Sequence, residues 1–433
     1  MSYAVGFWVA ADAFEVFRAQ RLSPDALGAL ARRRLGRLLV AAAGTEFYRR
    51  RLNAAGVDPR SPMLRSDPDA IMSVLAPVGK AELRDAGSTI LRGGRIHPSW
   101  QSSSSSGSTG EPFRVFYEPR AWATLKHLVK LRARMACGLQ TTDRIALFDA
   151  IPPSRRCGVS RASRVARISV LQPPDAMADQ LSAFAPDAVY GLPSALLETA
   201  SALRRRGAKV AIERVFTSGE LLQPAIRDAL ADAFGARVFD VYGSSETKEI
   251  AWECSSGGMH VNADVVHLEV LDDDGRPVPD GVEGNLVATP LVNHAMPLLR
   301  YRIGDRGSLR PHACACGHSF PLLGVVTGRA ADVLVLSDGR RISPYALTCA
   351  LELEPSLVRY QVNQLDPARI RVRAIVAPVA SLEAVAGRIR SLIRSQVAPH
   401  LETEVEFVDH LPTGPRAKFR VVQPLASPAE SLA

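Results

Sequence analysis

No apolar run in this 433-residue sequence reaches the length needed to cross a membrane. The first seventeen residues, MSYAVGFWVAADAFEVF, carry Asp12 and Glu15 inside their apolar stretch and lack a basic start, so we expect no secretory signal peptide. Cysteine is scarce, with six residues in the chain. We therefore expect a cytoplasmic protein without a membrane partner, whose thiols are reduced or metal-bound.

The sequence also contains no recognised nucleic-acid module, although its formal net charge is +9. Its short arginine clusters, at residues 32–34, 49–51 and 204–206, fall in Ala/Leu-rich helical patterns and are typical of solvated helix faces. Nucleic acid is therefore not an expected partner. A cleft that receives nucleotide phosphates is the better use of the positive charge.

The periodicity of apolar residues predicts an α/β protein. Helical spacing occupies the first 60 residues or so and returns at residues 119–137. From about residue 143, short strands alternate with helices predicted at residues 173–185, 193–206 and 222–235. This alternation is typical of a doubly wound, mainly parallel sheet.

The length of the chain is too great for one ordinary core, so we expect more than one domain. Short strands separated by turn signals predict a small β-barrel-like, β-rich subdomain within residues 250–327. Strands and helices then restart as a small α+β pattern. We expect a large N-terminal domain over residues 1–327 and a small, mobile C-terminal domain over residues 328–433.

The first stretch that carries chemistry is SSSSSGSTGEP, residues 102–112. Hydroxyls, backbone N–H groups and glycines in succession can wrap a polyphosphate. The stretch lacks the Gly-Lys-Ser/Thr ending of a Walker loop. A serine-rich flexible linker would have the same composition, and this alternative stays open.

The second and third stretches end predicted strands. DVYGSSE, residues 240–246, offers Tyr242 for stacking on a purine and Glu246 as an oxygen ligand for Mg²⁺. YRIGD, residues 301–305, ends in Asp305, which can accept hydrogen bonds from both ribose hydroxyls. The alternatives are an ordinary capped turn for the first and a Gly-Asp turn for the second.

The last two stretches are GRAAD, residues 328–332, and PTGPRAKFR, residues 412–420. The second places Lys418 on a Gly/Pro-rich loop. Taken alone, a lysine on such a loop is usually a solvated side chain.

In this order, the five stretches resemble the adenylate-forming superfamily of acyl- and aryl-CoA synthetases, and most closely its phenylacetate–coenzyme A ligase branch. FTSGE at residues 216–220 and YGLPS at residues 190–194 also look like that branch. The resemblance covers residues 75–422. It implies an AMP-forming ligase that uses ATP and Mg²⁺ and has a small mobile C-terminal domain.

The resemblance also implies roles for individual residues. The catalytic ones would be Lys418, Glu246 and Arg329, with Glu246 as the Mg²⁺ ligand. The nucleotide-binding ones would be Ser105, Ser106, Gly107, Ser108, Thr109, Gly110, Ser218, Gly219, Glu220, Asp240, Val241, Tyr242, Gly243, Ser244, Asp305 and Arg329. The pocket for the acid would draw on Tyr190, Gly191, Pro193, Thr217, Gly243 and Ser245.

The function implied is the activation of a small, aromatic carboxylic acid to an acyl-adenylate, followed by transfer to a thiol of coenzyme A or of a carrier protein. One alternative is transfer to an amine, which would make an amide. An alternative of another class is a catalytically silent nucleotide-binding module. A homodimer is a further expectation.

Cysteine and histidine form a separate constellation. Cys254, His260, Cys314 and Cys316 supply three thiols and an imidazole, a set that suits a tetrahedral structural zinc ion. Similar clusters occur in the ligase branch named above. The alternative is three unconnected thiols and a surface histidine, with His312 and His318 as spare candidates.

Overall fold

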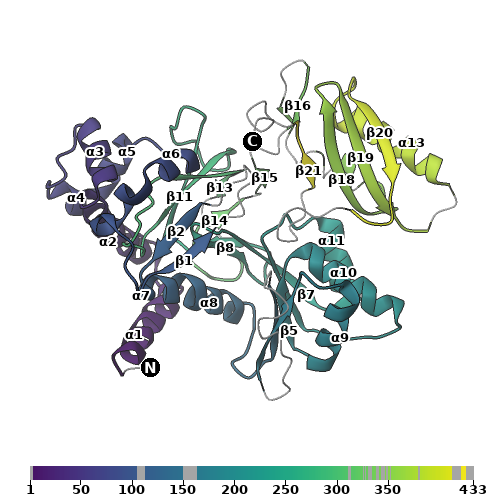
Figure 1. Ribbon diagram of the computed structural model, residues 1–433, viewed down its shortest axis with the longest axis horizontal. Helices are drawn as coiled ribbons and strands as arrows, with labels where there is room; N and C mark the ends of the chain where they lie inside the picture. The colour runs from purple at the N-terminus through teal and green to yellow at the C-terminus, as the bar shows by residue number, and fades with distance from the viewer. Residues whose placement is uncertain are drawn as a thin grey trace. The chain divides into compact units, whose positions relative to one another are not determined.

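The computed structural model describes residues 3–104, 113–149, 163–310, 314–324, 326, 328–329, 334–337, 341–342, 347, 350–351, 353–378, 381–411 and 421–425. The chain divides into two compact units (Figure 1). Unit 1 consists of Met1–Gly138 and Val241–Val326, and unit 2 of Leu139–Asp240 and Thr327–Ala433. In the described part of the chain, every helix is too short or too polar to cross a lipid bilayer.

Unit 1 opens with the helices predicted for the first part of the sequence. They are α1 (Tyr3–Ala19), α2 (Pro24–Ala43), α3 (Glu46–Ala54), α4 (Met63–Ser66), α5 (Pro68–Val74) and α6 (Lys80–Asp85). Helix α2 begins where the Ser23 side chain accepts a hydrogen bond from the Ala26 N–H at 3.3 Å, with Pro24 at the first helical position. Its buried stripe includes Leu27, Leu35 and Leu38, so one face of the helix enters the core.

A second helical stretch of unit 1 follows a short hairpin. Strand β1 (Gln101–Ser104) pairs antiparallel with β2 (Arg114–Tyr117), and α7 (Pro119–Ala123) continues through a π-helical turn into α8 (Val129–Ala136). On α8, the fully buried Arg132 donates hydrogen bonds at 2.9 Å to both carboxylate oxygens of Asp264. This bidentate pair fastens the helix to the β-rich part of the unit.

The β-rich part of unit 1 is antiparallel. Its strands are β8 (Lys248–Glu253), β9 (Met259–Val261), β10 (Val266–Leu271), β11 (Gly284–Pro290), β12 (Tyr301–Gly307), β13 (Leu309–Arg310), β14 (Leu322–Leu323) and the end of β7 (Arg237–Ser244). Strands β7, β8, β9, β14 and β13 neighbour one another in that order, and β11 lies between β10 and β12. The short strands predicted between the turn signals are therefore confirmed.

The first half of unit 2 contains the alternating strands and helices predicted from residue 143 onward. Strands β3 (Ile145–Asp149), β4 (Val165–Ser169), β5 (Ala188–Gly191) and β6 (Arg214–Ser218) are parallel, in the order β6-β5-β3-β4. Helices α9 (Pro174–Phe184), α10 (Pro193–Arg205) and α11 (Pro224–Phe234) lie side by side along them (Figure 1). Helix α11 ends at Gly235, whose φ of 63° suits a residue without a side chain. The α/β class is confirmed.

The second half of unit 2 has a sheet and a core of its own. Strands β18 (Leu357–Asp366), β19 (Arg369–Val376), β20 (Glu402–Phe407) and β21 (Val422–Gln423) lie in the order β20-β19-β18-β21, with α13 (Leu382–Leu392) after β19. Tyr360, Val372 and Ile389 belong to a core cluster drawn only from residues 334–422. A separate smaller domain is therefore confirmed, while its boundary at residue 328 stays a prediction.

Candidate functional site

The turn between β7 and β8 carries the predicted Mg²⁺ ligand, Glu246. The two strands are antiparallel, with Ser244 opposite Lys248 and Gly243 opposite Glu249. A Cβ atom on Gly243 would lie 2.3 Å from the carbonyl oxygen of Lys248, so only glycine fits at this point of the turn. The Ser244 hydroxyl accepts hydrogen bonds from the N–H groups of Glu246 and Thr247 at 3.2 and 3.1 Å. These bonds fix the backbone on which Glu246 stands.

The Glu246 carboxylate is buried, with 6% of the residue exposed. The Tyr301 hydroxyl donates a hydrogen bond to its Oε1 at 3.2 Å, and Lys80 Nζ lies 3.6 Å from the same oxygen. The Tyr117 hydroxyl donates to the main-chain carbonyl of Glu246 at 2.6 Å. Burial raises the pKa of Tyr117 well above its usual value, so its hydroxyl remains a donor.

A backbone contact between distant segments places two of these partners, Lys80 and Tyr301, beside Glu246. Val78 and Tyr301 form an isolated parallel β-bridge. The Val78 N–H donates to the Arg300 carbonyl, and the Arg302 N–H donates to the Val78 carbonyl, both at 2.9 Å. The bridge therefore places Lys80, two residues further on, beside the strand that begins with Tyr301.

Lys248 closes the turn from the other side. It has a φ of 65°, unusual for a residue with a side chain, and its ammonium group donates to the Ser245 carbonyl at 2.8 Å. The ammonium lies 4.9 Å from the centre of the Tyr117 ring and 5.1 Å from that of Trp122. Burial, followed by the charge of Lys126, lowers the pKa of Lys248 to about 7.

Asp305 and Tyr242, the predicted ribose and purine contacts, meet in the same unit. The Tyr242 hydroxyl donates a hydrogen bond to Asp305 Oδ2 at 2.8 Å. The pairing of β11 with β12 is irregular at Asp305 itself, between the Val287–Arg302 and Asn285–Arg306 pairs, and Gly304 has a φ of 92°. The extra residues form a bulge, a feature that is common next to active sites.

Other predicted residues lie in unit 2. The fully buried Thr217 donates a hydrogen bond to Asp240 Oδ1 at 2.8 Å. The two carboxylate oxygens of Glu220 accept hydrogen bonds from the N–H and hydroxyl groups of Ser194, at 3.0 and 2.9 Å. Glu220 therefore holds the N-terminus of α10, where a carboxylate is favourable.

Close packing surrounds the residues predicted for the acid pocket in unit 2. A Cβ atom on Gly191 would lie 2.7 Å from Cβ of Phe148, so β5 and β3 come too close for a side chain at that position. Pro193 is buried at the start of α10, while Tyr190 is half-buried.

Three predicted elements lie outside the described residues. They are the serine-rich loop with Ser105, Ser106, Gly107, Ser108, Thr109 and Gly110, the side chain of Arg329 and the loop of Lys418. Only the backbone of Arg329 is described, in strand β15 (Gly328–Arg329). The roles of these residues stay predictions.

The Cys/His constellation is brought together in unit 1. One ligand atom from each of Cys254, His260, Cys314 and Cys316 lies within 4.8 Å of the others. Strand β14 pairs with β9 at Leu322 and His260, which brings the second pair of cysteines back to the first half of the cluster. The two nearest sulfurs, of Cys254 and Cys314, are 3.5 Å apart.

The second shell of this cluster suits a metal. His260 Nδ1 lies 3.1 Å from the carbonyl oxygen of Phe320, which accepts a hydrogen bond from Nδ1–H. This leaves Nε2, 3.1 Å from Cys316 Sγ, as the ligand atom. Burial lowers the pKa of His260 and so favours the neutral imidazole that binds metals. Zinc with bonds of about 2.0–2.3 Å needs ligand atoms roughly 3.5–4 Å apart, which this cluster can supply.

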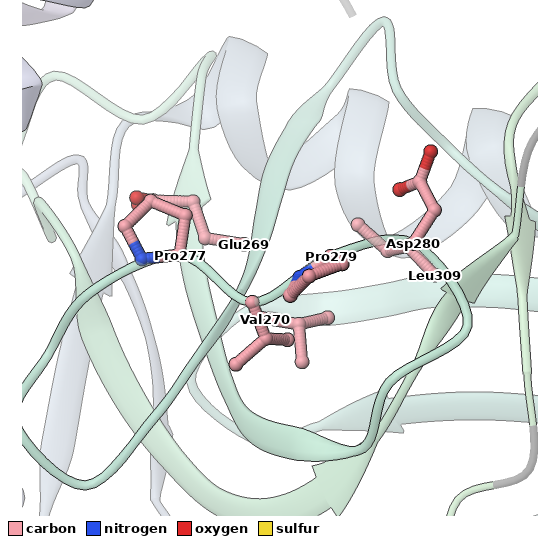
Figure 2. Close-up of a pocket in the computed structure, with 7 residues that line it drawn as sticks. Glu269, Val270, Pro277, Pro279, Asp280 and Leu309 are labelled. Atoms are coloured by element: carbon pink, nitrogen blue, oxygen red, sulfur yellow. The ribbon is translucent and has the colours of Figure 1, made fainter.

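The described part of the chain also has a pocket away from these residues (Figure 2). It is lined by Glu269, Val270, Pro277, Val278, Pro279, Asp280 and Leu309. Glu269 already pairs with Arg300 at 2.9 Å, so its charge is compensated. None of the predicted site residues lines this pocket, and we do not place the chemistry there.

Sequence analysis missed Lys80, Tyr117 and Lys248, and it assigned no role to Tyr301. One signal in the sequence could have found the lysines. Only six of the 53 basic residues are lysine, namely Lys80, Lys126, Lys130, Lys209, Lys248 and Lys418. Four of the six contact side chains or rings beside the turn and the start of β8. In a chain so rich in arginine, the concentration of lysine in this region is a signal that the sequence analysis could have used.

Comparison with known proteins agrees with the resemblance inferred from the motifs. Residues 105–290 match the AMP-binding enzyme family. The chain is similar to a phenylacetate–coenzyme A ligase of Thermus thermophilus, with 29% identity over 377 residues that cover 82% of each chain. It is also similar to the phenylacetate–coenzyme A ligase of Escherichia coli, with 27% identity over 73% of this chain and 72% of the relative.

Solved structures share the fold. A 2-hydroxyisobutyryl-CoA ligase in its postadenylation state, bound to an acyl-AMP, has a TM-score of 0.76 at 20% identity, covering 91% of this chain and 88% of its own. An amide bond synthetase from Marinactinospora thermotolerans has a TM-score of 0.55 at 20% identity, covering 75% and 68%. These structures confirm the fold, and the matches to the AMP-binding family and to the phenylacetate–coenzyme A ligases confirm the predicted resemblance to adenylate-forming enzymes.

Proposed function

We propose that this chain, whose residues 105–290 match the AMP-binding enzyme family, activates a small carboxylic acid with ATP and passes the acyl group to coenzyme A. A carboxylate oxygen of the acid bonds to the α-phosphorus of ATP while the bond to pyrophosphate breaks. The thiol then attacks the acyl carbon, and AMP leaves. The observation that carries the proposal is the buried Glu246 carboxylate, held on one oxygen, in the unit where Tyr242 meets Asp305.

The residues of unit 1 suit the nucleotide and its metal. Asp305 would accept the ribose hydroxyls, oriented by Tyr242, whose ring would stack on the purine. Glu246 would hold Mg²⁺, because a buried carboxylate with one oxygen already engaged offers the other as a ligand. When bound, Mg²⁺ neutralises phosphate charge that would otherwise repel the incoming carboxylate.

Lys418, Arg329 and the serine-rich loop complete the proposal. The loop would surround the phosphates with N–H and hydroxyl donors. Lys418 would contact the acid and the α-phosphate and stabilise the negative charge that grows there in the transition state. Arg329 would reach the nucleotide from the start of the smaller domain.

The acid would bind beside Tyr190, Gly191, Pro193, Thr217, Gly243 and Ser245. The relatives are ligases of phenylacetate, so an arylacetic or other aromatic acid is the substrate class that we propose.

Coenzyme A is the acceptor that the ligase relatives favour, and a carrier-protein thiol or an amine would use the same adenylate. Because the amide bond synthetase shares the fold at 20% identity, its acceptor chemistry is a contrasting outcome for the test below. ATP and coenzyme A are available in the cytoplasm, where we propose that the protein acts. A homodimer stays a prediction.

We further propose that Cys254, His260, Cys314 and Cys316 hold a structural zinc ion. All four tetrahedral positions would be taken by protein atoms, so this ion would have no open position for chemistry. Elemental analysis should find about one zinc per chain in protein purified without chelator. A zinc content no higher than that of the Cys314→Ser variant would contradict the assignment.

The proposed reaction is tested by ATP–pyrophosphate exchange over a panel of aryl, arylacetic, amino and fatty acids. We expect exchange that depends on one class of small acid, and on Mg²⁺. AMP release with that acid is then compared for coenzyme A and for simple amines. Exchange with no acid of the panel, in protein shown to be folded, would count against activation of such acids.

A further inference from the structure

We infer that Lys80 and Tyr301 are positioning residues for the Glu246 carboxylate, which act on Oε1 and so present Oε2 to magnesium. The inference rests on the proposed function, because it concerns the metal of that same site. Neither residue belongs to the set that the motifs singled out for the metal.

The contacts of Glu246 are unequal between its two oxygens. Tyr301 donates to Oε1 at 3.2 Å, and Lys80 Nζ lies 3.6 Å from Oε1. Among the described residues, none donates a hydrogen bond to Oε2. The one side-chain hydrogen bond and the nearest approach of the lysine are both at Oε1, so Oε2 is the oxygen that a ligand can use. Carboxylates that bind metals are held by hydrogen bonds in this way.

The backbone makes this arrangement rigid. The parallel bridge between Val78 and Tyr301 fixes both partners of Glu246 at once, because Lys80 lies two residues beyond Val78. Tyr301 and Val78 are both buried in the core, with 2% and 0% of each residue exposed. Lys80 follows Val78 by two residues. The contact is therefore part of the packed unit and differs from a pair of mobile surface side chains.

Tyr301 and Lys80 make different kinds of contact with Glu246. The Tyr301 hydroxyl is neutral and directional, so it sets the orientation of the carboxylate. The Lys80 ammonium lies beside a carboxylate that is almost excluded from water, and its positive charge offsets part of the cost of burying the negative one. A carboxylate held in one orientation can offer its second oxygen to a divalent cation.

The ion pair between Lys130 and Glu249 provides a matched control, because Glu249 lies on β8, three residues after Glu246. Lys130 Nζ is 2.9 Å from Glu249 Oε1, and the two side chains are 24% and 8% exposed. For Lys80 and Glu246 the values are 27% and 8%. The two lysine–glutamate pairs share burial and charge, and only the Lys80–Glu246 pair contains the proposed metal ligand.

The test measures metal binding at equilibrium, without turnover. Full-length protein is saturated with a non-hydrolysable ATP analogue, and Mn²⁺ is titrated with the unbound ion followed by electron paramagnetic resonance. We expect about 10-fold weaker Mn²⁺ binding for Lys80→Met and for Tyr301→Phe. Lys80→Arg should recover most of the loss, and Lys130→Met should stay within about twofold of the parent.

The outcomes separate the inference from the function beneath it. If the parent protein exchanges pyrophosphate and Lys80→Met binds Mn²⁺ as Lys130→Met does, or more tightly, the positioning role is wrong. If Lys80→Met fails to fold, Tyr301→Phe decides alone, because it removes a single oxygen. If the parent protein shows neither exchange nor Mn²⁺ binding with the analogue, the proposed function itself fails.

Discussion

Strand β8 has a different kind of candidate metal site at each end. Glu246 stands two residues before its start, and Cys254 directly follows its end. At the far end, four ligand atoms from three segments of chain lie within 4.8 Å of one another. At the near end, a single buried carboxylate has one oxygen held by neighbours.

The difference indicates which of the two proposed metals would be part of the protein and which would come with a substrate. A complete set of soft sulfur and nitrogen ligands binds zinc without help and closes it off from solvent. A single carboxylate cannot hold Mg²⁺ alone, because this ion keeps several waters and prefers phosphate oxygens for the rest of its shell. The cluster is therefore suited to hold the fold, and the turn to receive a metal–nucleotide complex.

The largest effect should come from Lys418→Ala. Loss of a cation that acts mainly in the transition state should reduce pyrophosphate exchange by about 100–1,000-fold, with ATP binding largely retained. Zinc content and melting temperature should stay those of the parent, because the residue belongs to neither end of β8. Exchange at the parent rate would remove Lys418 from the mechanism.

Glu246→Gln addresses the near end of β8 directly. The amide keeps the shape but loses the charge, so we expect the Mg²⁺ concentration for half-maximal exchange to rise by about 10–100-fold. Glu249→Gln is the control, since its carboxylate is equally buried and pairs with Lys130. Equal Mg²⁺ requirements for the two variants would contradict the assignment of Glu246 as the Mg²⁺ ligand.

Asp305→Ala tests whether the turn receives a nucleotide. Without the carboxylate, the ribose hydroxyls lose their acceptor, and charge-assisted hydrogen bonds contribute about 1.5–3 kcal/mol each. We expect calorimetry to show ATP affinity reduced by about 10-fold or more. Tyr242→Phe should lose less affinity, because it removes only the hydrogen bond that orients Asp305. Unchanged affinity in Asp305→Ala would contradict the assignment.

The smallest effect on chemistry should come from the far end of β8. Cys314→Ser, or removal of zinc by a chelator, should lower the melting temperature by several degrees, because the metal joins β8, β9 and the segment before β14. The exchange rate of the protein that remains folded should change by less than about threefold. A fall comparable to that of Glu246→Gln would mean that the two ends are not independent.

Much of this could be predicted from the sequence because local patterns carry it. Strand–helix alternation after residue 143 indicated the parallel sheet, since the periods of apolar residues differ between strands and helices. Short motifs singled out Glu246, Tyr242 and Asp305 as candidates, and the chemistry of their side chains singled out the cysteines and His260. Each of these signals lies within a few consecutive residues.

The tertiary structure alone decided which distant residues meet. Lys80 and Tyr301 have no spacing that relates them to Glu246, and only the bridge between Val78 and Tyr301 brings them to it. The same holds for the pairing of β14 with β9 that joins the halves of the cluster. Such contacts depend on strand register and core packing over hundreds of residues, which a local pattern does not contain. The sequence by itself determined the fold class and the chemistry available, and the packing decided which oxygen of Glu246 is held.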